Sequence, residues 1–246
     1  PGDLPILLKG EPGSGKTYLM RLIQEYCENN RLLSDSRKSR RIKLNQISDG
    51  EQYEKLEQLL SELEDGILYL EDISACNVRV QERLAEYIAN GAKKKGRSVK
   101  KENVRLVMSA DEKMFSQISR KLLVNVPVIC EIPSWIERNE DERKAFVVKF
   151  FKEEQEQLGR ILYLSEKLIH KLMNYQFEHN IAELKQCVTM VGANAYAQDS
   201  SEESLEIYLY NRPAKLQGSI SMKEQDATLV RLDVIQSDPV ADKILE

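Results

Sequence analysis

The sequence predicts an α/β protein, in which a parallel β-sheet is covered by helices on both faces, followed by a helical unit. Apolar segments without polar alternation, as expected of strands buried on both faces, alternate with segments of helical periodicity as far as Pro133. Beyond Pro133 only helical patterns follow, and the periodicity weakens from about residue 200. We therefore expect an α/β unit at 1–133, a helical unit at 134–199, and a tail or a linker to a further domain at 200–246.

Five short apolar segments are the candidate strands of the sheet. "LPILLKG" lies near the start of the chain, and "GILYLE" is apolar without a break before its glutamate. A run of this length is typical of a buried strand. The candidate strands are 4–10, 41–46, 66–71, 103–110 and 126–132.

Apolar residues at helical spacing fill the intervals between these strands. In "KTYLMRLIQEYCE", for example, Leu19, Ile23 and Cys27 recur every fourth residue. Gly91 is expected just past the end of one helix, and Ser165 is expected to be the N-cap of another. The candidate helices are 16–28, 53–63, 80–91 and 111–122 in the first unit, and 141–159, 165–174 and 180–197 in the second.

The composition favours a soluble, folded protein of the cytoplasm. Hydrophobic residues make up 41% of the chain and charged residues 31%, and no apolar run approaches the length of a membrane span. The four cysteines lie far apart, without a CxxC pair, which argues against a zinc site or disulfides and is typical of a reducing compartment. The chain begins with Pro1 and has no visible signal peptide, so we expect a piece of a longer protein.

A phosphate-binding motif lies between the first predicted strand and the first predicted helix. "GEPGSGKT" fits the pattern G-x-x-x-x-G-K-[ST], whose glycines let backbone N–H groups face phosphate oxygens at a helix N-terminus. We expect Lys16 to contact the outer phosphates of a nucleotide and the Thr17 hydroxyl to bind Mg²⁺. The alternative is a glycine-rich turn that matches the pattern by chance. The predicted nucleotide-binding residues are Gly10, Glu11, Pro12, Gly13, Ser14, Gly15, Lys16 and Thr17.

Two acidic residues, Glu71 and Asp72, directly follow the apolar segment "GILYL". In such a pair the first carboxylate is expected to hold Mg²⁺ and the second to orient or deprotonate the attacking water. The usual order is aspartate before glutamate, and its reversal shifts each carboxylate by one methylene, about 1.5 Å. Because a misplacement of about 1 Å can cost on the order of 10²-fold in rate, we expect nucleotide binding to survive better than turnover. The alternative is an exposed acidic turn.

Asp111 follows the predicted strand at 103–110 and has two interpretations. A polar residue there, Asp111 or Ser109, can sense the terminal phosphate, although a carboxylate facing phosphate repels it unless it is protonated or bridged by a metal. Asp111 is equally compatible with the N-cap of the next helix. Two basic segments, 37–41 and 93–101, are interpreted as solvated loops, and the net charge of -4 gives no overall attraction to nucleic acid.

Five segments occur in the order found in a known family. They resemble the AAA+ domains of bacterial enhancer-binding proteins, the ATPases that activate RNA polymerase carrying sigma-54; the segments are "LPILLKGEPGSGKT", "GILYLEDI", "NVRLVMSA", "EIPSWIER" and "NIAELKQCV". The stretch from "EIPSWIER" to Gly159 is most similar to the levanase-operon-regulator branch. The resemblance covers roughly residues 4–198.

The resemblance implies a fold, cofactors and residue roles. The fold is a P-loop AAA+ αβα sandwich with a five-stranded parallel sheet and a C-terminal helical lid subdomain. The cofactors are ATP and Mg²⁺, and the partner is a second copy of the chain in a homo-oligomeric ring such as a hexamer. By position, Glu71 is the Mg²⁺-side carboxylate and Asp72 the water-activating one, while Asp111 falls at the first sensor.

The chain departs from the family at three places. Family activators carry a GAFTGA loop, which contacts sigma-54, between the P-loop helix and the acidic pair, and the absence of this loop here argues against remodelling of the sigma-54 polymerase. Ala182 stands at the second-sensor arginine. The arginine-finger region offers Arg120 but has Val124 and Asn125 where relatives place arginines. Because an arginine finger can contribute roughly 10³ to 10⁵ in rate, these departures indicate a relaxed demand for hydrolysis.

Four functions are compatible with these residues. The first is an ATP-binding AAA+ module of a bacterial transcription regulator, which couples ATP binding to subunit assembly with weak or no hydrolysis and reaches DNA through domains outside this segment. The second is an active AAA+ motor that remodels a transcription factor or another protein, with Arg120 as its finger. The third is a small-molecule kinase, against which the long lid argues. The fourth is a scaffold whose P-loop no longer binds nucleotide, against which the complete "GEPGSGKT" argues.

Overall fold

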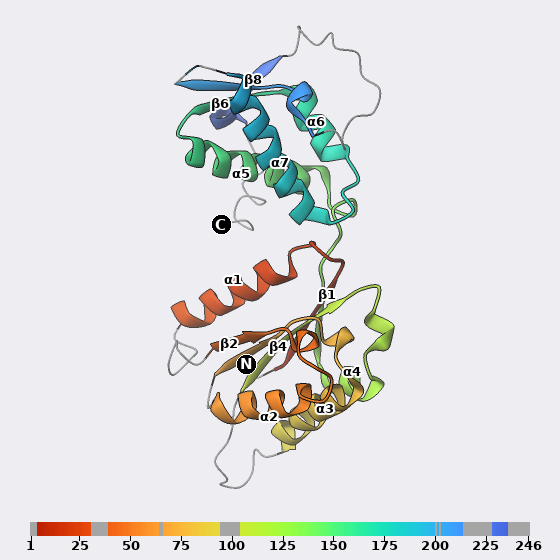
Figure 1. Ribbon diagram of the computed structural model, residues 1–246. Helices are drawn as coiled ribbons and strands as arrows, with labels where there is room; N and C mark the ends of the chain where they lie inside the picture. Colours follow the sequence, from red (N-terminus) through yellow and green to blue (C-terminus); the bar gives the residue numbers. More distant parts are fainter. Residues whose placement is uncertain are drawn as a thin grey trace. The chain divides into compact units, whose positions relative to one another are not determined.

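The computed structural model describes residues 4–30, 39–63, 66–93, 104–199, 201, 203–213 and 228–235. The chain divides into two compact units, Pro1–Ile132 and Pro133–Glu246, which are described separately below (Figure 1). Among the described residues, no helix is both long enough and apolar enough to cross a membrane.

The first unit is built on a parallel five-stranded sheet. Its strands lie in the order β2-β3-β4-β1-β5, so β1, which leads into the glycine-rich loop, lies between β4 and β5. Parallel pairing places the C-terminal ends of the strands at one edge, with Gly10 of β1 opposite Asp111 of β4. The strands are β1 (Ile6–Gly10), β2 (Ser39–Ile42), β3 (Ile67–Leu70), β4 (Arg105–Asp111) and β5 (Val128–Glu131).

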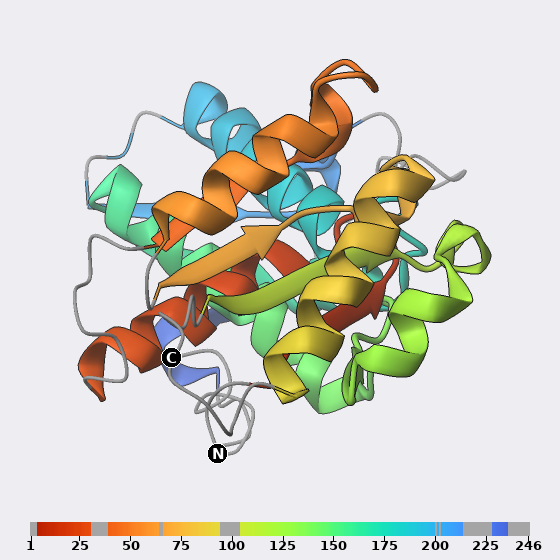
Figure 2. The ribbon, with the colours of Figure 1, turned by 90° about the horizontal axis from the view of Figure 1, so that it is seen from below.

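Helices cover both faces of this sheet (Figures 1 and 2). Neighbouring residues of β1 enter different cores: Leu8 packs in a cluster with Met20 of α1, whereas Leu7 packs with Leu56 of α2 and Leu84 of α3. Both faces are therefore apolar, which explains strands without polar alternation. The helices are α1 (Lys16–Asn29), α2 (Gln52–Glu62), α3 (Val78–Lys93) and α4 (Arg120–Asn125), and the short 3-10 turns are η1 (Leu44–Gln46), η2 (Ile73–Ala75) and η3 (Phe115–Gln117).

The structure corrects three predicted boundaries in this unit. The strand expected at 41–46 ends at Ile42 and is followed by η1. Helix α3 continues to Lys93, so Gly91 lies inside the helix and not past its end. The helix expected at 111–122 is replaced by the last residue of β4, then η3 and the short helix α4. In each case the apolar pattern is too short to fix where the element begins or ends.

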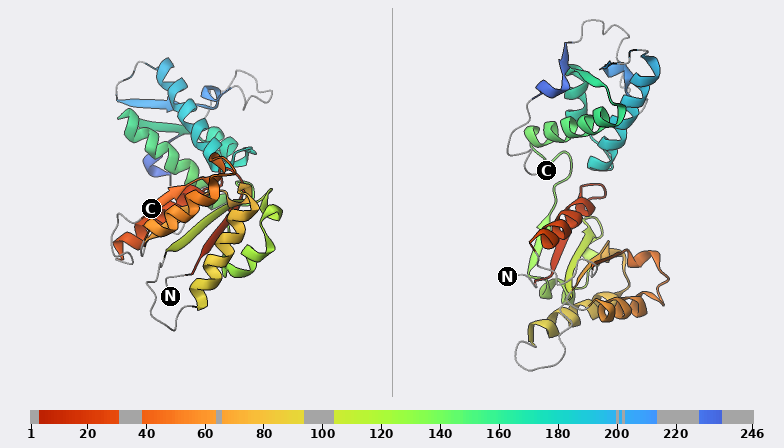
Figure 3. Two further views of the ribbon diagram at one scale, coloured as in Figure 1. Left: turned by 60° about the horizontal axis from the view of Figure 1, so that its bottom comes forward. Right: turned by 90° about the vertical axis from the view of Figure 1, so that its left-hand side faces the viewer.

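The second unit contains the three predicted helices and, in addition, a three-stranded sheet. Ser165 Oγ accepts a hydrogen bond of 3.2 Å from the Leu168 N–H, which confirms the predicted N-cap. The strands lie along one side of α5 and α7 in the order β7-β6-β8 (Figure 3). The elements are α5 (Glu140–Leu158), β6 (Ile161–Ser165), α6 (Glu166–Asn174), α7 (Asn180–Gln198), β7 (Ser204–Ile207) and β8 (Leu229–Arg231).

Two of these strands correct the predicted tail. Residues 204–207 and 229–231 lie in the segment for which the sequence predicts a tail, yet they pair with β6, in parallel and antiparallel register respectively. Leu205, Ile207 and Leu232 are buried in the same apolar core as the helices. Strands of three to five residues contain too few positions for a periodic pattern, so the sequence does not reveal them.

Candidate functional site

The glycine-rich loop joins β1 to α1 with a backbone that requires glycine. Gly13 and Gly15 have φ angles of 75° and 111°, in the left-handed region that glycine adopts freely. A Cβ atom at Gly10 would lie 2.9 Å from the carbonyl oxygen of Ile132, so no side chain fits there. Because α1 begins at Lys16, directly after the loop, the N-terminal end of the helix lies at the loop. This arrangement favours an anion.

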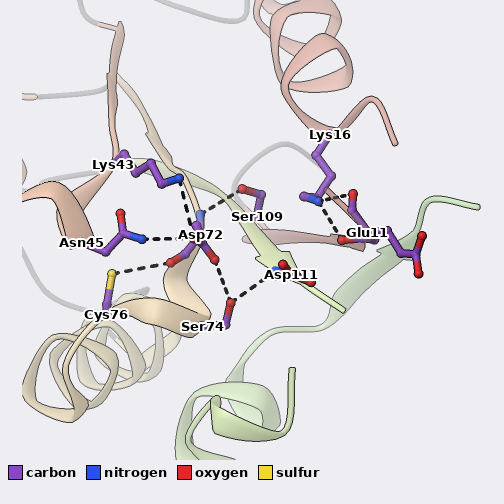
Figure 4. Close-up of polar contacts among 10 residues, drawn as sticks. Glu11, Lys16, Lys43, Asn45, Asp72, Ser74, Cys76, Ser109 and Asp111 are labelled. Carbon is purple, nitrogen blue, oxygen red and sulfur yellow. Dashed lines mark hydrogen bonds and ion pairs between the residues drawn. The ribbon is translucent and has the colours of Figure 1, made fainter. Parts of the chain in front are cut away.

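The amine of Lys16 lies against the loop that precedes it (Figure 4). Its Nζ donates hydrogen bonds of 2.7 Å to the carbonyl oxygens of Gly10 and Glu11. Burial lowers the pKa of Lys16, and the negative charges of Asp111 and Asp72 act in the opposite direction. Two of the predicted acidic site residues therefore belong to the electrostatic surroundings of the predicted phosphate-binding lysine.

Asp72, two residues after the end of β3, has hydrogen-bond or ion-pair partners in three segments. Its backbone is left-handed (φ 55°, ψ 53°), which is uncommon for any residue other than glycine. Its N–H donates a hydrogen bond of 3.1 Å to Ser109 Oγ. Its carboxylate accepts hydrogen bonds from Ser74 Oγ at 2.9 Å and from Asn45 Nδ2 at 3.0 Å, and Lys43 Nζ lies 3.8 Å from Oδ2. Both carboxylate oxygens thus have partners within the chain.

Glu71 has a different partner from Asp72, although the two are adjacent. Its carboxylate forms an ion pair with Arg41 of β2, and its N–H donates a hydrogen bond of 2.9 Å to the Ile42 carbonyl. Arg41 and Lys43 lie two residues apart on extended backbone and therefore share one side of that strand. The side chains of Glu71 and Asp72 are 20% and 26% exposed, which argues against the alternative of an exposed acidic turn.

Ser74 links the loop after β3 to the end of β4. Its hydroxyl donates to Asp72 Oδ1 and accepts a hydrogen bond of 3.2 Å from the Asp111 N–H. Asp111 itself ends β4, and its Oδ1 accepts a hydrogen bond of 2.9 Å from the Lys113 N–H. No helix begins at Asp111, so the alternative interpretation as an N-cap is wrong. Burial raises the pKa of the nearby Cys76 to about 12, so its thiol stays protonated 3.9 Å from the Asp72 carbonyl oxygen.

Arg120 lies on the surface of helix α4. It is the first residue of this helix, directly after the N-cap Ser119, whose Oγ accepts a hydrogen bond of 3.2 Å from the Leu122 N–H. Arg120 is exposed, and its guanidinium forms no ion pair or hydrogen bond with any residue that the structure describes. Val124, one turn further on, is 77% exposed. The outer side of α4 therefore offers a cation and an apolar side chain to solvent.

The structure thus separates the predicted site residues into two groups. Lys16, Asp72 and Asp111 share one electrostatic environment. Glu71, by contrast, forms an ion pair with Arg41, and Arg120 is exposed on the surface. The remaining loop residues differ in exposure: Pro12 and Thr17 are exposed, Glu11 and Gly13 are half-buried, and Gly10 and Ser14 are buried.

Four polar side chains that contact the acidic pair are not predicted by the sequence. Ser74 could have been found, because a hydroxyl two residues after an aspartate is a common local hydrogen-bond pattern. The other three come from β2 and the turn after it and reach the acids only because β2 pairs with β3; they are Arg41, Lys43 and Asn45. The basic segment 93–101 lies outside the described side chains, and of 37–41 only residues 39–41 are described.

A five-stranded parallel sheet in this order, with a glycine-rich loop before α1 and acidic residues after β3, defines a P-loop protein of the AAA+ fold. The profile of the Sigma-54 interaction domain family matches residues 2–128. The chain therefore belongs to this family.

Known proteins resemble the chain over most of its length. The transcriptional regulatory protein DagR of Salmonella typhimurium is 25% identical across 88% of this chain, which spans only 25% of the length of DagR. Among solved structures, NtrX from Brucella abortus in complex with ATP has a TM-score of 0.65 and 19% identity, covering 88% of this chain and 52% of NtrX. A mutant of RuvB from Thermotoga maritima has a TM-score of 0.60 and 15% identity, covering 85% of this chain and 59% of RuvB. These structural similarities show the shared fold.

Proposed function

We propose that this chain is an ATP-binding AAA+ module of a bacterial transcription regulator, in which ATP binding promotes the assembly of subunits and hydrolysis is slow. Membership of the Sigma-54 interaction domain family and similarity to the regulator DagR support this proposal. The similar NtrX structures contain ATP in one case and ADP in another. The module would work in the cytoplasm as a homo-oligomeric ring, and it would reach DNA through parts of the protein outside this chain.

The observation that carries the proposal is the geometry of the loop at Lys16. The loop combines left-handed glycines with the N-terminal end of α1. An ammonium group has three N–H donors, and Lys16 uses two of them on loop carbonyls, which leaves one for a phosphate oxygen. We propose that all eight residues from Gly10 to Thr17 surround the phosphates.

The donor set at this edge of the sheet suits Mg²⁺, which prefers hydroxyl and carboxylate oxygens. We propose that the Thr17 hydroxyl and the Glu71 carboxylate would hold the ion, which requires Glu71 to leave Arg41. Mg²⁺ supplies neutralisation of phosphate charge when it is bound. Among the described residues no cluster of three or more acidic, histidine or cysteine side chains is placed to hold a metal ion.

Slow hydrolysis is proposed because both acids are engaged elsewhere. Asp72 would orient the attacking water, but its two oxygens already accept from Ser74 and Asn45, and Lys43 lies nearby. A general base must be within hydrogen-bond reach of the proton that it takes. Asp72 would have to exchange these partners before it could act, and Asp111 would sense phosphate only with its charge neutralised.

We further propose that this module does not remodel the sigma-54 polymerase. The described residues between β2 and β3 contain only η1 and α2, and the sequence of this interval has no GAFTGA segment. A regulator of this kind would instead use ATP-dependent assembly to arrange its other domains.

A second function, an active AAA+ motor, is favoured by one observation. Arg120 is exposed and its guanidinium has no partner within the described residues. Such a side chain could act as an arginine finger toward ATP bound by a neighbouring copy.

Side-by-side measurement of ATP binding and ATP turnover by the purified chain with Mg²⁺ distinguishes these functions. The Lys16→Ala variant gives the background level of ATP binding and turnover. The Lys55→Ala variant, on α2, shows the effect of removing a lysine outside the predicted site. Micromolar binding that Lys16→Ala abolishes, with turnover no faster than this background, is the expected result. Turnover above the background that rises with protein concentration would instead favour the motor. Failure of the wild type to bind ATP would overturn both.

A further inference from the structure

A buried glutamine on α3, Gln81, bonds two distant segments at once. Its side chain is 1% exposed. Its Nε2, which carries two N–H donors, lies within hydrogen-bond distance of three carbonyl oxygens, those of Ile73 at 3.3 Å, Cys76 at 3.0 Å and Gln117 at 3.5 Å. Its Oε1 accepts a hydrogen bond of 2.6 Å from the Ser119 N–H. Only this orientation of the amide satisfies the partners, because the Ser119 N–H needs an acceptor and the three carbonyls need a donor.

One of these segments is attached to Asp72. Ile73 follows Asp72 directly in the chain and begins η2, and Cys76 follows the end of that turn. Ser74, between them, donates to the Asp72 carboxylate and accepts from the Asp111 N–H. A shift of Asp72 therefore moves the carbonyl groups that Gln81 bonds.

The other segment is the start of α4. Gln117 ends η3, and Ser119 is the N-cap of α4. On the inner side of α4, Leu122 is buried and packs in the core, whereas Arg120 and Val124 are exposed on the outer side. The bond from Gln81 to Ser119 thus fixes the end of α4 that carries Arg120.

We propose that Gln81 is a positioning residue that transmits the state of the nucleotide site from Asp72 to the exposed surface of α4. A buried backbone group that loses its hydrogen-bond partner raises the free energy of the protein. If the loop after Asp72 moved without the start of α4, backbone groups bonded to the Gln81 amide would lose that partner, so we expect the two segments to move together. This inference rests on the proposed function, because it requires ATP at the loop. It adds the route by which ATP would alter a surface available to a second copy of the chain.

Hydrogen–deuterium exchange with and without MgATP tests the proposal. Peptides covering 10–17, 71–77 and 115–125 report the loop, the acidic segment and α4. In the wild type we expect MgATP to change exchange in all three. In Gln81→Met, which keeps the length of the side chain but not its hydrogen bonds, the changes at 10–17 and 71–77 should remain and the change at 115–125 should be lost.

Gln52→Met is the matched control. Gln52 is also 1% exposed; it donates to the Ile47 carbonyl and accepts from the Asn77 N–H, and none of its hydrogen bonds within the described residues reaches α4. We expect this variant to retain the change at 115–125. If Gln81→Met does not fold, Gln81→Asn serves instead: it keeps the amide on a side chain one methylene shorter, which cannot reach both segments at once, so the change at 115–125 should again be lost.

The outcomes separate this inference from the proposed function. If MgATP leaves residues 10–17 of the wild type unchanged, the proposed function fails and the inference fails with it. If residues 10–17 and 71–77 respond but 115–125 do not, only the inference fails. A Gln81 variant that retains the full change at 115–125 would also overturn the inference, because a purely structural glutamine is not needed for the response of α4.

Discussion

The guanidinium of Arg41 on β2 and the carboxylate of Glu71 after β3 form an ion pair across two neighbouring strands. Lys43, two residues further along, lies near Asp72 in the same way. The acidic pair is therefore faced by two cations, Arg41 of β2 and Lys43 directly after it, and under the proposed function Mg²⁺ would compete with Arg41 for Glu71. This relationship gives the site a first testable property.

We expect Arg41→Gln to lower the Mg²⁺ concentration needed for ATP to stabilise the protein. Because a partly exposed ion pair contributes about 0–1 kcal/mol, the shift should not exceed about fivefold. Thermal unfolding at fixed ATP and varied Mg²⁺ measures it. Arg40→Gln, on the same strand, is the control and should behave as the wild type. An unchanged or higher Mg²⁺ requirement in Arg41→Gln would show that the ion pair does not oppose the metal.

Asp72→Asn should separate ATP binding from hydrolysis. Asparagine adopts the left-handed backbone of this position as readily as aspartate, so the fold should be retained. An amide cannot take a proton from water, and we expect any hydrolysis that the wild type shows above the Lys16→Ala background to be lost while ATP still binds. Hydrolysis at the wild-type rate would mean that another group activates the water.

Gly10→Ala should destabilise the first unit and weaken ATP binding. The added Cβ would lie 2.9 Å from both the Ile132 carbonyl oxygen and Ser14 Oγ. Overpacking of this kind costs typically about 1–3 kcal/mol, which urea denaturation can measure. Gly50→Ala is the matched control, because no atom lies within 4 Å of its Cβ position, and its effect should stay within about 0.5 kcal/mol. Equal effects of the two substitutions would contradict the packing described at the loop.

The cysteines should differ in reactivity according to their burial. Cys130 is exposed, whereas Cys27, Cys76 and Cys187 are buried. A thiol reagent at pH 8 should therefore label one thiol per native chain and four per unfolded chain, and Cys130→Ser should reduce the native count to zero. Labelling of a second thiol at the same rate would contradict the burial.

Stability should also fall in alkaline solution because of two of these thiols. Burial raises the pKa of Cys76 to about 12 and that of Cys187 to about 12, compared with 9.0 in the unfolded chain. Between these values the unfolded state has lost protons that the folded state keeps, so the free energy of unfolding falls as the pH rises from about 9 toward 12. In the double variant Cys76→Ala, Cys187→Ala, urea denaturation at pH 8 and pH 10 should show a smaller fall.

The part of the site that is contiguous in the chain could be predicted from the sequence. The loop from Gly10 to Thr17 lies between a strand and a helix that the apolar pattern also predicts, so motif and context agree. Arg41 and Asn45 could not be predicted, because they reach the acidic pair through the pairing of β2 with β3. The strand order, which places β4 between β1 and β3, depends in the same way on contacts between distant residues.

In the second unit, the long helices could be predicted but the short strands could not. Helices α5 and α7 each have 19 residues, enough to repeat an apolar spacing several times. Strand β8 has three residues, and its place is set by pairing with β6. Predictions made from local periodicity therefore weaken as elements become shorter.

The left-handed backbone at Asp72 gives the reversed order of the acids a conformational reason. Aspartate enters this region more readily than glutamate, because its short side chain can bond locally, as it does here to Ser74. Exchanging the two acids to recreate the order found in active ATPases would place glutamate on a backbone that disfavours it. Re-engineering hydrolysis would thus require reshaping the turn at 72–76 together with the acids, because the backbone conformation at residue 72 restricts which acid can stand there.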